Sequence, residues 1–546
     1  MKSKTWLVSF ALTFVLIMGL LAALNALVDP FGAFGDPLYG WYSYGFTKNP
    51  RMSKIAFLDM YAGNYDSYLI GASTTGSYPI DQLERYTGAR FFNLFGYGGD
   101  MHKTRYMAEY LLSHFTVRNL IINISIIDAE YSNLTLDRLT NQLPARVDGS
   151  SAFSQTTQYL TANPRYALDK MAAYPTDTWL PQPFDEFDPM TGAYNRTSRD
   201  VVPIGDMGSY LEAFPTFKDY SPEGRTLWHI EKCVQDVAAI LDLCREQQVN
   251  ATVIFAPFYD PYLRMFSPGA LSRFRKSLAE ITEFWDFSNS SASLDPRYFY
   301  DRGHFRSPLG AMALARIFGD TSMYIPQDYG FHVTAQNVDG HNDALVKSPA
   351  DIPHEKELPI LTWGQLHEGD LPGFEAQIAA LKNAGYQSVT FDQAIDYVTS
   401  GKELPHRPVV LTFDGGTLDG DSPAWGVLEE YGMTAGSYAQ GLGAGDIIRG
   451  GSEEASINAF DTAFGEAVAE WDSKTGGDAP LTVYSYPLEE VSVLTDALLV
   501  KSGVRMTLCD QVGNNTLIKG LPQSMIQLRR FFVDAALSPD GLMDLL

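Results

Sequence analysis

The chain has 546 residues, of which 45% are hydrophobic and 13% aromatic. At roughly 100–200 residues per domain, this length allows two to four domains, each with a buried core. The formal net charge of −25 argues against a nucleic-acid partner, because the phosphate backbone selects basic surfaces. The three cysteines, Cys233, Cys244 and Cys509, are spaced for neither a disulfide framework nor a cysteine zinc site.

The N-terminal segment has the composition of a membrane span. Lys2 and Lys4 precede an uncharged stretch, residues 5–28, which exceeds the roughly 20 residues that a bilayer crossing needs. These basic residues, with Asp29 after the stretch, predict a single-pass protein of the cytoplasmic membrane whose N-terminus lies inside. A cleaved signal peptide is the alternative, but its apolar region would be shorter and no clear A-x-A site is found. Either way, the bulk of the chain is expected to be extracytoplasmic.

The following segment, residues 31–325, alternates between strand and helix patterns. Strands are expected at 66–73, 89–100, 118–127 and 250–257, and helices at 101–115, 227–249 and 269–285. This alternation predicts an α/β domain with a doubly wound parallel sheet. Ligands of such sheets bind beyond the C-terminal ends of the strands. We expect a linker at 326–356.

A second α/β pattern occupies residues 357–546. Strands are expected at 358–363, 407–414, 434–441 and 481–487, with another beginning at 388, and helices at 374–385 and 424–432. No internal repeat relates the two halves. The sequence therefore predicts an N-terminal anchor, residues 1–30, followed by two α/β domains.

The first candidate site combines a serine with a distant Asp-x-x-His pair. Ser73 follows the first expected strand within IGAST, and Asp301 and His304 lie three residues apart in YFYDRGHF. Such a carboxylate can orient the imidazole, which can then take the serine proton. Each piece also has an ordinary explanation, since a serine after a strand is often a helix N-cap.

Three blocks of residues 66–318 resemble the SGNH/GDSL hydrolase superfamily, in particular its membrane-anchored, extracytoplasmic branch associated with envelope polysaccharides. LIGAST is similar to the nucleophile block, FFNLFGYGG to the asparagine/glycine block, and YFYDRGHFRSPLGAMALARIFG to the terminal D-x-x-H block. The resemblance implies that Ser73 is the nucleophile, His304 the general base and Asp301 its orienting group. Gly98, with Gly96 and Gly99 beside it in the sequence, would be the backbone oxyanion donor.

The third family block departs from the pattern. Its usual Gly-x-Asn-Asp supplies a second oxyanion donor, whereas this chain has LIINISIIDAEYS. Asn123 lies inside the strand, and Asp128 stands near the expected place without an amide beside it. One oxyanion donor is worth about 3 kcal/mol of transition-state stabilisation. Sugar O-acetyl esters remain the expected substrates, and hydrolysis and acyl transfer both stay open.

Residues 358–490 resemble the NodB-type polysaccharide deacetylase domain, a (β/α) barrel, through LPILTWGQLH, RPVVLTFDGGTLDG and VYSYPLEE. Members of that family remove N-acetyl groups with a divalent metal held by one Asp and two His. Asp414 matches the base position, but Gly415 replaces the metal-binding Asp and Trp363-Gly364 replaces the usual Tyr-His. All nine histidines lie at or before His406, so none follows Asp414.

We therefore expect the second domain to bind no metal or other cofactor and to be inactive as a deacetylase. Asp446, Glu453 and Glu454 are the alternative, as oxygen ligands of a harder cation. Aromatic faces suit sugar rings, so Trp363, Tyr484 and Tyr486 are candidate glycan-binding residues, and ordinary core aromatics are the alternative.

The expected function is the modification of a cell-envelope or secreted polysaccharide. The first domain would act as a serine-dependent O-acyl esterase or O-acetyltransferase, and the second would bind glycan or polysaccharide-assembly proteins. An N-deacetylase with unusual ligands and a non-catalytic assembly protein are the two alternatives. The expected contacts with other molecules are thus a polysaccharide, a membrane through the N-terminal helix, and no nucleic acid.

Overall fold

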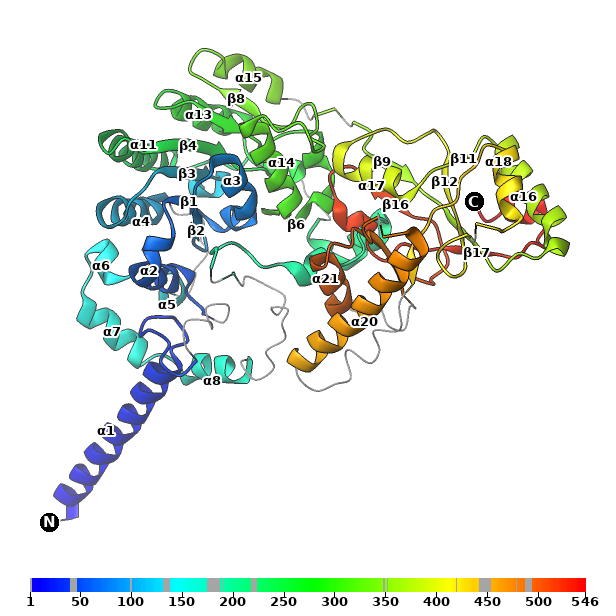
Figure 1. Cartoon of the computed structure of the whole chain (residues 1–546). Coiled ribbons are helices and arrows are strands. Elements are labelled where there is room, and N and C mark those ends of the chain that lie inside the picture. Colours follow the sequence, from blue (N-terminus) through cyan, green and yellow to red (C-terminus); the bar gives the residue numbers. More distant parts are fainter. Residues whose placement is uncertain are drawn as a thin grey trace. The chain divides into compact units, whose positions relative to one another are not determined.

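The computed structural model of the chain describes residues 2–39, 47–98, 101–130, 138–173, 187–188, 190–217, 223–346, 349–350, 352–418, 420–440, 453–477, 479–486 and 493–546 (Figure 1). The chain forms two compact units. The first comprises residues 1–196, 216–319 and 326–351, and the second comprises residues 197–215, 320–325 and 352–546.

The first unit is built on a six-stranded sheet with the order β2-β1-β3-β4-β5-β8. Its strands are β1 (Ser67–Gly71), β2 (Phe91–Phe95), β3 (Asn119–Ile124), β4 (Asn250–Phe255), β5 (Phe284–Asp286) and β8 (Phe331–Val333). All neighbouring strands pair in parallel except β5 and β8, which are antiparallel. Every residue of β1 and β2 is buried, as expected for strands covered on both faces of a parallel sheet.

Helices cover this sheet on both faces. They include α3 (Ile80–Thr87), α4 (Met101–His114), α11 (Ile230–Glu246), α13 (Pro268–Ala279) and α14 (Ser307–Phe318). The chain runs from β1 to β2 and then back past β1 to β3, so right-handed crossovers place α3 and α4 on opposite faces. Consistent with this, α11 packs against α4 and α13, while α14 packs against α3. The predicted mixed α/β fold with parallel sheets is confirmed.

Residues 326–351, expected as part of a linker, are folded into the first unit. They carry β8 and helix α15 (Val338–Leu345), and β8 extends the sheet at β5. The expected helix at 269–285 ends at Ala279, and Phe284–Asp286 forms β5 instead. The aromatic pair Phe284 and Trp285 favours a strand, and the Trp285 ring packs on His332 at a centroid distance of 5.0 Å.

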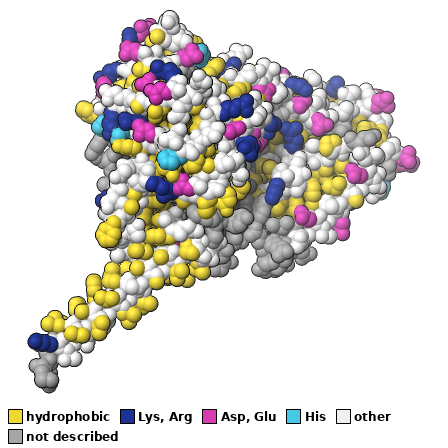
Figure 2. Space-filling model, turned by 60° about the vertical axis from the view of Figure 1, so that its left-hand side comes forward, with side chains coloured by type: hydrophobic (Ala, Val, Ile, Leu, Met, Phe, Trp, Pro, Cys, Tyr) yellow, Lys and Arg dark blue, Asp and Glu magenta, His cyan; other side chains and the backbone are white. Residues whose placement is uncertain are grey.

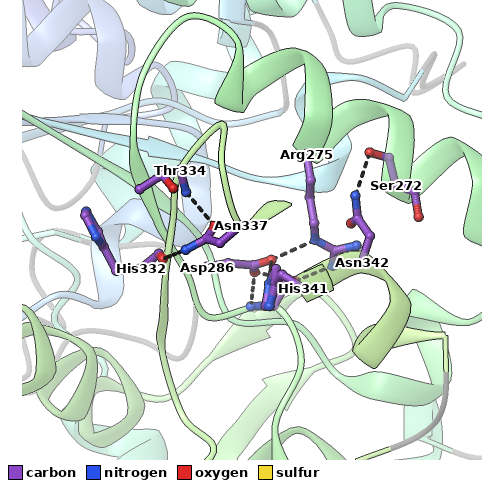
Figure 3. Close-up of polar contacts among 9 residues, drawn as sticks. Ser272, Arg275, Asp286, His332, Thr334, Asn337, His341 and Asn342 are labelled. Atoms are coloured by element: carbon purple, nitrogen blue, oxygen red, sulfur yellow. Dashed lines mark hydrogen bonds and ion pairs between the residues drawn. The ribbon is translucent and has the colours of Figure 1, made fainter. Parts of the chain in front are cut away.

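Buried polar contacts hold α15 in place (Figure 3). Asp286 accepts from Arg275 Nε at 2.7 Å, and His341 Nε2 lies 3.0 Å from the same carboxylate. Burial by itself would raise the pKa of Asp286, but Arg275 and His341 together hold that pKa well below its usual range. The amide of Asn342 donates to the carbonyl of Ser272 at 3.2 Å. These contacts connect α15 to both α13 and β5.

The second unit contains two parallel sheets. One has the order β11-β12-β10-β17 and the other β13-β14-β15. The strands are β10 (Ile360–Trp363), β11 (Gln387–Ser388), β12 (Pro408–Phe413), β13 (Ala439–Gln440), β14 (Val483–Ser485), β15 (Met506–Leu508) and β17 (Phe531–Val533). Single parallel bridges, Leu411 with Ala435 and Leu508 with Leu528, connect segments of the two sheets. Closure into a full barrel stays a prediction.

Two further helices are α20 (Glu453–Thr475) and α1 (Lys2–Val28). Helix α20 was not expected from the sequence. The glycine-rich, acidic sequence before it drew attention away from the helix-favouring Ala and Glu residues within it. Helix α1 is long and apolar enough to cross a membrane. Length and composition fit an anchor and a signal sequence equally.

Candidate functional site

Ser73 stands at the C-terminal edge of the sheet, where the chain order reverses between β1 and its neighbours. Strand β1 ends at Gly71, and a short 3-10 helix, Ser73–Ser77, follows. Gly71 has φ +153°, and a Cβ there would lie 2.4 Å from both Asn123 O and Thr75 Oγ1. Only glycine therefore permits this tight passage from strand to turn, which leaves Ser73 at the place where such sheets bind ligands.

The structure brings Ser73 together with His304 and Asp301, although 231 residues separate the serine from the histidine. The latter two lie on a short hairpin of β6 (Phe299–Asp301) and β7 (His304–Phe305). Ser73 Oγ lies 2.8 Å from His304 Nε2. His304 Nδ1 lies 2.9 Å from each carboxylate oxygen of Asp301. The three side chains thus form one continuous hydrogen-bonded relay.

Asp301 is held as an anion. Its Oδ1 accepts the backbone N–H groups of Gly303 at 2.8 Å and His304 at 3.0 Å. Burial alone would raise the pKa of Asp301, but the His304 side chain, the Gly303 N–H and the Arg196 charge bring it well below its usual range. An ionised Asp301 favours the tautomer in which His304 Nδ1 carries the proton, and Nε2 is then free to accept from Ser73.

Two buried asparagines that sequence reasoning did not assign support the serine turn. Asn93 on β2 donates to Thr75 O at 2.8 Å, and Asn123 on β3 donates to Thr74 Oγ1 and Thr75 Oγ1 at 3.0 Å each. Tyr78 donates its hydroxyl proton to Asn123 Oδ1 at 3.0 Å. The available signal was an asparagine among the apolar residues of each of the two strands that flank β1, Asn93 in FFNLF and Asn123 in NLIINI. The Asn123 amide is thus engaged with the turn.

The glycine loop after β2 is fixed by Arg51. This buried side chain donates to Tyr97 O at 2.6 Å and to Gly98 O at 3.4 Å. Gly98 has φ +73°, and a Cβ on Gly96 would lie 2.3 Å from Arg51 Nε. Gly99 lies outside the described residues. The carbonyls of Tyr97 and Gly98 therefore have a set direction, at the end of a strand that neighbours β1.

Asp128 has a local structural role. Its Oδ2 accepts from the Ser125 N–H at 2.8 Å and from the Ser125 hydroxyl at 3.1 Å. This closes a capping box at the end of β3. The third family block thus contributes no described side-chain amide that is directed to Ser73.

Asp414 follows β12 and lines a cavity of about 460 Å³ in the second unit, together with Asp370 and Asp534. In the part of the chain that the structure describes, no three His, Cys, Asp or Glu side chains are grouped closely enough to hold a metal ion. Asp446 lies outside that part, and the side chains of Glu453 and Glu454 are not described. The described residues around Asp414 therefore do not fit the metal that the deacetylase resemblance implies.

The expected glycan-stacking surface of Trp363, Tyr484 and Tyr486 is not presented by the second unit. Trp363 is 0% exposed and donates its indole N–H to Gln377 Oε1 at 2.8 Å. Tyr484 and Tyr486 are also buried, and the Tyr486 hydroxyl donates to Asp496 at 2.5 Å. These aromatics belong to the core because their strands are covered, which corrects the prediction.

Comparisons with known proteins concern deacetylases. No protein-family model matches the chain. A curated protein of Bacillus subtilis (strain 168), named "Putative polysaccharide deacetylase YxkH", is 34% identical over 94 residues, which are 16% of this chain and 34% of that protein. The chain thus spans about a third of the length of this curated relative.

Solved deacetylase structures align with part of the chain. Streptococcus pyogenes deacetylase PplD, in complex with acetate, is 13% identical and covers 35% of this chain and 98% of its own, with a TM-score of 0.29. The de-N-acetylase of Aggregatibacter actinomycetemcomitans is 14% identical and covers 35% and 100%, with a TM-score of 0.28. TM-scores this low carry no conclusion. The sequence comparison shows that 94 residues of this chain are similar to the protein named "Putative polysaccharide deacetylase YxkH".

Proposed function

We propose that this protein modifies a polysaccharide outside the cytoplasm, as a serine-dependent carbohydrate O-acyl esterase or O-acetyltransferase of the SGNH type. The observation that carries the proposal is the relay Ser73 Oγ–His304 Nε2–Asp301, with distances of 2.8 Å and 2.9 Å. The relay lies at the strand edge where doubly wound sheets bind ligands. The homology to polysaccharide deacetylases supports a carbohydrate substrate.

In the proposed reaction, Ser73 Oγ attacks the carbonyl carbon of an acyl ester while its proton moves to His304 Nε2. Asp301 holds the imidazolium by the Nδ1–H bond and stays ionised. Collapse of the tetrahedral intermediate breaks the C–O bond to the sugar, and the leaving alcohol takes the proton from Nε2. Water or a sugar hydroxyl then attacks the acyl-serine, and His304 acts as base again.

The negative charge that develops on the carbonyl oxygen requires donors. Backbone N–H groups of the Ser73 turn and of Gly98 are the proposed donors. Side-chain hydrogen bonds on either side favour this assignment. Asn93 and Asn123 hold the Ser73 turn in place, and Arg51 holds the glycine loop. Because the Asn123 amide already donates to Thr74 and Thr75, the proposed oxyanion site relies on backbone N–H groups.

The second unit is proposed to bind glycan or a polysaccharide-assembly protein, with Asp414 as a residue retained from a deacetylase framework. The protein would be held at the cytoplasmic membrane by α1, with both units outside. A non-catalytic assembly protein would require an unreactive Ser73.

Covalent labelling tests the serine directly. A fluorophosphonate probe is expected to label wild type, and Ser73→Ala is expected to abolish labelling. Ser77→Ala is a matched control, because Ser77 lies in the same 3-10 helix and its hydroxyl has no hydrogen-bond partner among the described residues. If Ser73→Ala labels as strongly as wild type, the proposal fails. Acetate release from acetylated glycans, with and without a sugar acceptor, then separates hydrolysis from transfer.

A second candidate function is polysaccharide N-deacetylation by the second unit. The sequence similarity to YxkH favours it. It predicts that the purified full chain retains a stoichiometric divalent ion after dialysis, measured by elemental analysis. Asp414→Ala should lose that ion, whereas the exposed Asp392→Ala in the same unit should keep it. An ion content unaffected by Asp414→Ala would exclude this function.

A further inference from the structure

The last turn of α1 is built into the first unit. Asn25 is 0% exposed, and its amide donates to Leu160 O at 3.0 Å and to Ala162 O at 2.9 Å. These two carbonyls lie at and just beyond the end of helix α7 (Ala152–Leu160), and α1 also packs against α8 (Pro164–Ala173). By contrast, the preceding apolar turns of α1 are exposed, as a membrane span requires.

The exit from α1 is equally fixed. Asp29 is fully buried with φ +45°, and its carboxylate accepts the N–H groups of Ala33 at 2.8 Å, Phe34 at 2.7 Å and Asp36 at 3.1 Å. Phe31 packs on Tyr159 of α7 at a centroid distance of 4.9 Å. These contacts give the chain a compact turn as it leaves the helix.

Helix α8 is tied to the same turn by a buried ion pair. Lys170 Nζ donates to Asp29 O at 2.9 Å and to Asp36 Oδ1 at 3.1 Å. The side chains of Lys170 and Asp36 are 1% and 6% exposed. Removing one partner of such a buried pair is strongly destabilising. The direction of α1 relative to α7 and α8 is therefore set by packing, hydrogen bonds and charge.

Apolar side chains are exposed around this exit. Phe153 on α7 is 83% exposed, and Leu168 and Met171 on α8 are 54% and 39% exposed. Leu27 at the end of α1 and Leu38 beyond it are each 55% exposed. Figure 2 shows hydrophobic side chains covering α1 and continuing onto the part of the unit from which it emerges. In Figure 1, α7 and α8 lie beside that exit and α15 lies at the other end of the unit.

We propose that α7 and α8 rest on the outer surface of the membrane that α1 crosses, and that α1 is retained as a permanent anchor. A fixed α1 that spans the bilayer brings the surface around its exit to the level of the lipid headgroups. Exposed Phe and Leu side chains are favourable at that level, and Arg165, exposed on α8, can reach lipid phosphates from it. Cleavage before Asp29 would remove Asn25 and leave the Leu160 and Ala162 carbonyls without its amide.

The proposal rests on the extracytoplasmic placement of the proposed function, but its test uses no activity. The full chain is reconstituted in phosphatidylcholine vesicles containing some phosphatidylglycerol and a lipid with a nitroxide at the headgroup. A fluorescent thiol label is placed by Phe153→Cys or Leu168→Cys, with Asp339→Cys on α15 as control. Cys233, Cys244 and Cys509 are buried, so they compete little for the label.

Labels at 153 and 168 are expected to lose most of their fluorescence to the nitroxide lipid, and the label at 339 to lose none. Equal quenching at all three positions would overturn the membrane contact. Intact mass of protein extracted from the producing cells' membranes is expected to include residues 1–29, and a mature chain that starts beyond Asn25 would overturn the permanent anchor. Both results are independent of Ser73 labelling, so failure of the proposed chemistry and failure of this inference are distinguishable.

Discussion

Asp301→Asn is expected to lower kcat for acyl-ester cleavage by about four orders of magnitude, the size of effect seen when the triad carboxylate of a serine hydrolase becomes an amide. In this chain the carboxylate contacts His304 Nδ1 with both oxygens and also accepts two backbone N–H groups. An amide at that position can preserve the hairpin geometry through its oxygen. It no longer stabilises the imidazolium, and its NH₂ group favours the tautomer with the proton on Nε2, which cannot accept from Ser73.

The measurement is kcat and KM for release of acetate from an acetylated glycan or a chromogenic acetate ester. KM is expected to change little, because Asp301 acts through His304. Asp81→Asn is the matched control, since Asp81 is an exposed carboxylate of the same unit and pairs with the nearby, exposed Arg85. Unchanged turnover in Asp301→Asn, with folding intact by circular dichroism, would contradict the proposed role of the relay.

The sequence predicted those parts of the fold that depend on local patterns. The buried strands around Ser67–Gly71 and Pro408–Phe413 appear where apolar runs end in glycine-containing turns. The meeting of Ser73 with His304 was predicted by resemblance to a family, since no local pattern links residues 231 apart. The roles of Asn93 and Asn123 depend on strand register, with Asn123 directly opposite Gly71. Register cannot be obtained from either strand alone.

Two other expectations failed because burial depends on the whole fold. Trp363 was a candidate sugar platform, yet its ring lies in a cluster with Phe374 and Phe413. A large aromatic in an apolar strand is most often core. The segment 326–351 had the mixed composition of a linker, but it is held by Asp286, a residue 55 positions before His341. A three-residue edge strand such as β8 gives almost no periodic signal.

The buried ion pair between Arg275 and Asp286 carries the largest expected effect on stability. Arg275→Met is expected to destabilise the first unit by about 3–5 kcal/mol, because it leaves the Asp286 carboxylate without its main cation. The two side chains are 3% and 1% exposed, and Arg275 also donates to Ser288 Oγ at 2.7 Å. Arg85→Met is the matched control, since its pair with Asp81 is 65% and 72% exposed and should change stability by less than about 1 kcal/mol.

The pH dependence sharpens this test. Burial raises the pKa of Asp286, and the charge of Arg275 is the largest single effect that lowers it. The net result is a pKa below the ordinary value of 3.8. The stabilisation by the ionised carboxylate is therefore complete above pH 3.8 and is lost as the pH falls through the lower folded value. In urea unfolding of the full chain, the difference between wild type and Arg275→Met should be largest near neutral pH and shrink in acid. Adding Asp286→Leu should restore part of the lost stability. A double variant no more stable than Arg275→Met would show that the contacts of Asp286 with His341 and Ser288, rather than its ion pair with Arg275, carry the stability at this position.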